Sequence, residues 1–169
     1  MHQENRPQRH GRMSKEMDMG KGMLGSSIVT QIGFIVKDVD VSKKKFADFL
    51  GLEEPASFWT DGIEKSQSVY RGQPCPAKAK LAFLKVGDQV DIELIQPDGQ
   101  PSVWQEFLDE KGEGIQHIAF QIKDTKGKLL ALKEIGMPTL QTGEYTGGRY
   151  SYVDALDELK VVIELLEND

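Results

Sequence analysis

One stretch of the chain, Gly114-Ile-Gln-His-Ile-Ala-Phe-Gln-Ile-Lys-Asp124, has the side-chain alternation of a β-strand. His117 shares one face of this strand with Ala119 and Gln121, and the other face is apolar. A lone histidine in such a strand is usually a structural core residue. The strand alone therefore predicts no site.

An earlier copy of this stretch changes its interpretation. Gln31-Ile-Gly-Phe-Ile-Val-Lys-Asp38 matches His117-Ile-Ala-Phe-Gln-Ile-Lys-Asp124 position by position, with Ile, Phe, Lys and Asp identical. His117 stands in the second copy where Gln31 stands in the first. The match indicates an internal duplication.

A second pair of segments supports the duplication. Val90-Asp-Ile-Glu-Leu-Ile95 is similar to Val161-Val-Ile-Glu-Leu-Leu166, and the pair aligns Glu93 with Glu164. Each half of the chain therefore brings one polar residue on its first strand and one carboxylate on its last.

The expected order of elements is βαβββ in both halves, which predicts an α+β fold. In the first module, at 27–97, Ser42 is a plausible N-cap for the helix and Gly51 a natural stop. Its strands are expected at 28–36, 53–60, 79–86 and 90–96, and its helix at 41–50. The second module, at 114–169, is expected to hold strands at 115–123, 139–143, 149–154 and 159–167 and a helix at 125–135.

Two further segments complete the predicted organisation. Residues 98–113 form a linker with a short helix capped by Ser102, whose apolar side includes Val103 and Trp104. Residues 1–26 are polar and rich in Gly and Met, which predicts a flexible tail.

Composition bounds the class of protein. The chain has 169 residues, of which 38% are hydrophobic, so a packed core is expected. A net charge of −6 argues against nucleic-acid binding. The single cysteine, Cys75, and the lack of a membrane-spanning or signal-type apolar run predict a cytoplasmic protein without membrane partners.

The duplication suggests a metal site. If the first and last strands of each module are neighbours, Gln31 lies near Glu93 and His117 near Glu164. If the two sheets also face each other, these four groups converge. Three oxygens and one imidazole nitrogen suit a divalent Co, Ni, Mn or Zn ion. Four protein ligands on an octahedral metal leave two adjacent positions, which two vicinal oxygens of a substrate can fill.

Each of these residues also has a simpler explanation. His117 alone is more often a satisfied core histidine, and Glu93 and Glu164 can reach solvent from half-exposed strands. However, Glu164 lies in an apolar run, where burial of a carboxylate is costly unless it is paired or metal-bound.

The chain resembles the vicinal oxygen chelate (glyoxalase/bleomycin resistance/dioxygenase) superfamily. The resemblance is carried by Gln31–Val39, Phe49-Leu-Gly-Leu52 and Val162-Ile-Glu-Leu165. Gly112-Glu-Gly-Ile-Gln-His-Ile-Ala-Phe120 is most similar to methylmalonyl-CoA epimerases. The resemblance implies two βαβββ modules whose curved mixed sheets surround a metal cavity, with helices outside, and a homodimer. The family's ligand positions fall on Gln31, Glu93, His117 and Glu164.

Two departures from the epimerase pattern keep alternatives open. Epimerases usually have His at the position of Gln31, and a Gln–Glu–His–Glu set is more similar to some glyoxalase I enzymes. A second carboxylate base, expected near Lys80 or Leu81, is missing from that segment.

The function that this resemblance implies is a metal-dependent epimerase or isomerase. It would abstract a proton next to a carbonyl through a metal-stabilised enolate, with Glu164 as first choice of base and Glu93 as second. Arg149 is a candidate to hold a substrate carboxylate or phosphate. The substrate is a small molecule, and an acyl-CoA is one candidate. The alternatives are a glyoxalase I-like lactoylglutathione lyase and a metal-free protein that sequesters a small molecule or antibiotic.

Overall fold

The computed structural model describes residues 22–169. Most of the predicted tail, including His2 and His10, lies outside this range. Within it the strands are β1 (Val29–Ile35), β2 (Ser57–Trp59), β3 (Val69–Tyr70), β4 (Gln73–Pro74), β5 (Ala79–Val86), β6 (Val90–Pro97), β7 (Gly114–Gln121), β8 (Thr139–Tyr145), β9 (Gly148–Val153) and β10 (Val162–Asn168). The helices are α1 (Val39–Leu50), α2 (Ile63–Ser66), α3 (Val103–Lys111), α4 (Thr125–Glu134) and α5 (Leu156–Leu159).

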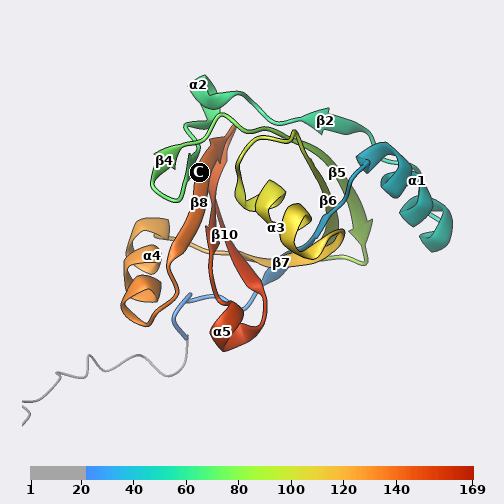
Figure 1. Ribbon diagram of the computed structural model, residues 1–169. Coiled ribbons are helices and arrows are strands. Elements are labelled where there is room, and N and C mark those ends of the chain that lie inside the picture. Colours follow the sequence, from blue (N-terminus) through green and yellow to red (C-terminus); the bar gives the residue numbers. More distant parts are fainter. Residues whose placement is uncertain (1–21) are drawn as a thin grey trace, which may run out of the picture.

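The ten strands form one mixed sheet in the order β2-β5-β6-β1-β7-β10-β9-β8-β3-β4 (Figure 1). β1, β6, β5 and β2 come from the first repeat, and β7, β10, β9 and β8 from the second. In both repeats the first strand pairs in parallel with the last. The predicted α+β fold of two βαβββ modules is confirmed.

The two repeats join through the antiparallel pair of β1 and β7. Ile32 lies opposite Ile118, which is its counterpart in the duplication. The approximate twofold symmetry of the molecule therefore passes between these two residues. Polar residues at equivalent positions on either side of this axis are brought to the same part of the sheet.

A segment of the first repeat crosses to the second and pairs with its outer strand. β3 and β4 follow β2 in the chain, yet β3 pairs with β8, with Val69 opposite Thr142. In Figure 1 the chain runs over the top of the molecule from β2, past α2, to β4 beside β8. The crossing segment therefore connects β2 and β8, which are the outer strands of the sheet when β3 and β4 are left aside.

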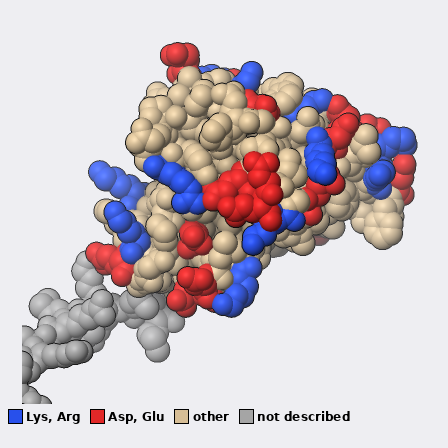
Figure 2. Space-filling model, viewed as in Figure 1, with Lys and Arg blue, Asp and Glu red and all other residues tan. Residues whose placement is uncertain are grey.

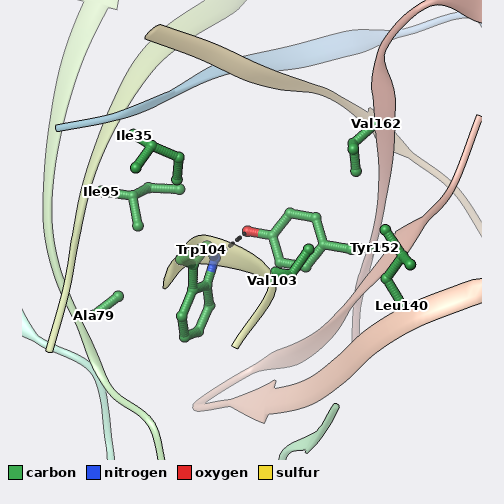
Figure 3. Packing of buried hydrophobic residues seen from close by; sticks show 8 residues of the cluster. All are labelled: Ile35, Ala79, Ile95, Val103, Trp104, Leu140, Tyr152 and Val162. Atoms are coloured by element: carbon green, nitrogen blue, oxygen red, sulfur yellow. Dashed lines mark hydrogen bonds between the residues drawn. The ribbon is translucent and has the colours of Figure 1, made fainter. Parts of the chain in front are cut away.

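The helix of the linker fills one end of the curled sheet (Figure 1). Trp104 is 4% exposed and packs with Ile35 and Ile95 of the first repeat and with Tyr152 and Val162 of the second (Figure 3). The indole Nε1 of Trp104 donates to the hydroxyl of Tyr152 at 3.1 Å. The predicted linker helix is therefore part of the core that joins the two repeats.

The helices α1 and α4 cover the outer face of the sheet. Ala47 of α1 belongs to a cluster with Leu84 and Leu94, and Leu132 of α4 to a cluster with Leu165. No helix of residues 22–169 has the length and apolarity required to span a membrane.

Two local predictions were wrong. The N-cap of α1 is Asp38, not Ser42, because the Asp38 carboxylate accepts hydrogen bonds from the N–H groups of Asp40 and Val41 and starts the helix earlier. The last strand begins at Val162 rather than at residue 159. The preceding residues form α5, which ends at Lys160 in the left-handed conformation with φ 65°.

Candidate metal centre

The side chains of two glutamates and one histidine meet on the inner face of the sheet. Glu93 on β6 lies opposite Gly33 of β1, and Gly33 lies opposite His117 of β7. Glu164 on β10 lies opposite Ala119 of β7. The three side chains therefore come from β6, β7 and β10, which lie within four consecutive strands of the sheet, β6-β1-β7-β10. All three are buried, and His117 is 0% exposed.

Their free atoms converge. Nε2 of His117 lies 3.3 Å from Oε2 of Glu93 and 3.1 Å from Oε2 of Glu164. The ligand atoms of the three residues all lie within 4.8 Å of one another. None of the three named atoms has a partner with hydrogen-bond geometry. Buried polar atoms are seldom left without a partner, and this donor set suits a divalent cation of intermediate hardness.

The electrostatics of the cluster favour positive charge. Burial raises the pKa of Glu93, and the negative charge of Glu164 raises it further. Burial lowers the pKa of His117, but Glu164 and Glu93 outweigh this effect and raise that pKa to about 9. The two buried carboxylates thus favour a positive charge beside them, which a proton on the imidazole would supply in part and a bound dication in full.

Space for the imidazole comes from a glycine. A Cβ atom added to Gly33 would lie 1.9 Å from Cε1 of His117. The ring therefore lies directly over the backbone of β1. In the second repeat the counterpart of Gly33 is Ala119, and it lies opposite Gln31.

Gln31 lies on the wall of the same cavity and is half-buried. Its neighbours across the sheet are Asp91 and Ala119. Of the four ligands predicted from the sequence, Glu93, His117 and Glu164 are thus in mutual contact, and Gln31 lines the cavity that they face.

Arg149 does not belong to this site. It alternates along β9 with Tyr150 and Tyr152, which line the cavity, and so it points to the outer face. There its Nη2 lies 2.7 Å from Oδ1 of Asp169 and its Nη1 3.5 Å from Oε2 of Glu167. Arg149 therefore lies away from the cavity that carries the cluster, and its contact with a substrate stays a prediction.

The cavity measures about 760 Å³. Trp104 and Tyr152 line its closed end, and the exposed turns at 87–89 and 144–146 line its opposite end. Aromatic rings make up much of the wall between them, from Phe58, Trp59, Phe83, Tyr145 and Tyr150. Among residues 22–169, the acidic residues of the lining are Asp61, Asp88, Asp91, Glu93, Glu144 and Glu164, and Lys85 is the one lysine or arginine.

Two residues of this site were not predicted. Asp91 lies two positions before Glu93 on β6 and so shares its face, and the period of two along the strand was a usable signal. Tyr152 is 2% exposed, and its ring centre lies 5.0 Å from that of His117. No sequence pattern indicates this contact, because it depends on the pairing of β9 with β10.

The fold and the site together define a protein with paired βαβββ repeats around a cavity that carries a Glu–His–Glu cluster. The chain belongs to the Glyoxalase/Bleomycin resistance protein/Dioxygenase superfamily, whose family description matches residues 30–153. The comparison with curated protein sequences found no match.

Several solved structures share the fold. Methylmalonyl-CoA epimerase from Mycobacterium tuberculosis is 24% identical, with a TM-score of 0.61 over 87% of this chain and 90% of that one. A hypothetical protein from Bacillus halodurans is 21% identical, with a TM-score of 0.54 over 83% and 94%. A variant of the Streptomyces coelicolor methylmalonyl-CoA epimerase, in complex with 2-nitronate-propionyl-CoA, is 18% identical, with a TM-score of 0.58 over 85% and 98%.

Proposed function

We propose that the protein is a metal-dependent isomerase or epimerase that removes a proton from a carbon next to a carbonyl. The observation that carries the proposal is the group of buried ligand atoms from Glu93, His117 and Glu164, which lack hydrogen-bond partners among residues 22–169. Glu93 and Glu164 also line the cavity. The likeness of the fold to methylmalonyl-CoA epimerases supports the same chemistry.

The residues present fit a divalent cation. Glu93, His117 and Glu164 would hold it, and Gln31 is the fourth ligand that we propose from the cavity wall. When bound, the metal supplies positive charge beside a substrate carbonyl oxygen. The two carboxylates balance that charge in a site where burial strengthens every electrostatic interaction. The donor set fits Co, Ni, Mn and Zn alike.

The chain's carboxylates have distinct roles in proton transfer. We assign Glu164 as the base, because it is 3% exposed and its Oε2 faces the cavity without a hydrogen-bond partner. Glu93 is the second choice. Epimerisation also needs an acid on the opposite face of the carbon. We assign this role to Asp91, which lines the cavity and is only half-buried.

Variants of the ligands test the metal site. We expect His117→Ala to lose metal affinity first, and Glu164→Gln to weaken binding and abolish turnover. Metal content is measured by mass spectrometry, and turnover by incorporation of solvent deuterium at the α-carbon of acyl thioesters. The control Glu144→Gln, at the exposed end of the cavity, should keep both. Wild-type metal content and turnover in both ligand variants would contradict the proposal. A wild-type protein that binds no metal would favour the alternative of a protein that sequesters a small molecule.

The role of Asp91 is tested separately. Asp91→Asn should keep the metal and lower kcat by about 10²- to 10⁴-fold, the usual contribution of a general acid or base. Asp88→Asn, on the neighbouring turn, should leave kcat unchanged. An unchanged kcat in Asp91→Asn would exclude it as the second group.

One observation favours a second function, a glyoxalase I-like lyase. Gln31 lies on the cavity wall where epimerases usually have histidine. Incubation of the metal-loaded protein with the glutathione adduct of methylglyoxal discriminates the two. Formation of the thioester product without deuterium exchange into acyl thioesters would support the lyase.

A further inference from the structure

His117 makes a second contact, on the side of the ring away from the carboxylates. Its Nδ1 lies 3.2 Å from Oε1 of Gln116, and Nε2 of Gln116 donates to the backbone carbonyl of Val103 at 2.8 Å. Gln116 is 2% exposed and His117 is 0% exposed. Both hydrogen bonds therefore lie out of water.

The chemistry of these groups fixes the direction of each hydrogen bond. The carbonyl of Val103 can only accept, so the amide of Gln116 must turn its NH₂ group toward it. The oxygen of that amide then faces the imidazole, and it too can only accept. Nδ1 of His117 must carry the proton. In the neutral ring this leaves the lone pair on Nε2, which is the atom nearest Glu93 and Glu164.

Val103 is itself held in place. It is the first residue of α3, and its N–H donates to Oε1 of Gln141 at 2.9 Å. Gln141, on β8, is 0% exposed. Two buried glutamines thus hold the start of the linker helix, one from β7 and one from β8. Gln116 is the one that also contacts His117.

We propose that Gln116 is a positioning residue that holds the imidazole of His117 with Nδ1 protonated and Nε2 free to bind metal. The carbonyl at the start of α3 fixes the orientation of the Gln116 amide. Partners behind a metal-binding histidine commonly set its tautomer and ring orientation. The part of the inference that concerns metal affinity rests on the proposed function, whereas the tautomer does not.

The tautomer is measured by long-range ¹H–¹⁵N NMR on full-length protein labelled at histidine. His117→Ala identifies the resonances of His117. The metal-free protein is titrated with base until the His117 resonances stop shifting, so that the ring is observed in its neutral form. We expect a protonated Nδ1 and an unprotonated Nε2. A wild-type protein with the proton mainly on Nε2 would overturn the inference without recourse to any variant.

A matched pair of variants tests Gln116 as the cause. Gln116→Leu and Gln141→Leu each remove one buried amide from the start of α3, but only the first loses the contact with His117. Gln116→Leu should transfer proton population to Nε2 and weaken zinc binding by about 10- to 100-fold. Gln141→Leu should keep the wild-type tautomer and zinc affinity.

The outcomes distinguish a specific role of Gln116 at His117 from general support of the start of α3. Equal changes in both variants would mean that α3 acts as a general support, which overturns the role of Gln116. An unchanged tautomer in Gln116→Leu would also overturn the role of Gln116. Gln116→Met, which removes the same acceptor with a flexible apolar side chain, should shift the tautomer in the same way and serves if the leucine variant does not fold. Failure of the wild-type protein to bind zinc would sink the proposed function but leave the tautomer test standing.

Discussion

Gly33 and His117 form a cross-strand pair in which one residue has no side chain so that the other can lie flat over the backbone. Gly33 does not adopt a positive φ angle, so its backbone conformation does not demand glycine. What demands it is the imidazole ring, which occupies the place of a Cβ atom. A residue without any functional group thereby sets where the candidate metal ligand can lie.

This contact predicts the effect of a single methyl group. Gly33→Ala should lower the free energy of unfolding by about 1–3 kcal/mol and weaken metal binding, because the ring must move away from the carboxylates. Urea denaturation and zinc titration measure the two effects. Gly62→Ala is the matched control, since Gly62 has φ −71° and open space around its Cβ position. Equal free energies of unfolding for the two variants would show that the His117 ring can move without loss of stability.

At the scale of elements, the second repeat ties its helix to its last strand through one carboxylate. Glu167 on β10 accepts hydrogen bonds from the hydroxyl and N–H of Thr125 and from the N–H of Asp124, at the start of α4. These bonds, the Thr125 hydroxyl first, lower the pKa of Glu167 from 4.5 to about 2. The helix N-terminus is therefore capped by a residue that lies more than forty positions later in the chain.

The lowered pKa predicts how stability depends on pH. A carboxyl that binds protons less readily in the folded state stabilises it at pH values above 4.5, and this contribution is lost as the pH falls through about 2. Glu167→Gln should cost about 1 kcal/mol at neutral pH, as the loss of a helix cap does. The difference from wild type, measured by urea denaturation, should shrink below pH 4.5. The exposed Glu134→Gln on the same helix is the control, and a pH-independent difference for Glu167→Gln would contradict the prediction.

For the whole molecule, the distribution of charge bears on the substrate. Among the described residues, the charged side chains of the cavity lining are acidic apart from Lys85, whose Nζ lies 3.7 Å from Oδ1 of Asp91. Figure 2 shows a further group of acidic side chains over the end of the molecule that α3 fills. α3 contributes Asp109 and Glu110 to that end, together with Glu106, whose charge is paired with that of Arg71 at 2.6 Å. A ligand with several negative charges is therefore disfavoured at both ends.

This charge predicts a preference among thioesters. If the chemistry proposed above holds, methylmalonyl-N-acetylcysteamine, which lacks the phosphates of CoA, should have a lower KM than methylmalonyl-CoA at low salt. Added salt should lower the KM of the CoA ester, because ions screen the repulsion over about 10 Å at 0.1 M. Steady-state kinetics in a salt series measure this. A KM of the CoA ester that rises with salt would instead reveal a basic site for its phosphates.

Other properties of the whole molecule remain predictions. We propose the modules 27–97 and 114–169 with the linker 98–113, and a homodimer, as the family resemblance implies. Sedimentation at several protein concentrations tests the dimer. Cytoplasmic location is likewise a prediction.

Much of the site could be predicted from the sequence, because alternation along a strand and similarity between repeats are properties of short segments. Aligning the copies was enough to select Gln31, Glu93, His117 and Glu164. The site prediction supposed that the first and last strands of each module are neighbours, and the structure shows that they pair, in parallel. The same rule of alternation pointed to Asp91, but without a known cavity face there was no reason to select it.

The remaining features depend on which residues meet across the sheet, and that is set by register and by the curl of the sheet. The outward direction of Arg149, the edge-to-face contact of Tyr152 with His117 and the hydrogen bond of Gln116 to Val103 all depend on how separate elements meet. The strand and helix pattern is a property of neighbouring residues, and it survives in the sequence. The partners of a buried amide or imidazole are chosen by long-range packing, which leaves no local trace.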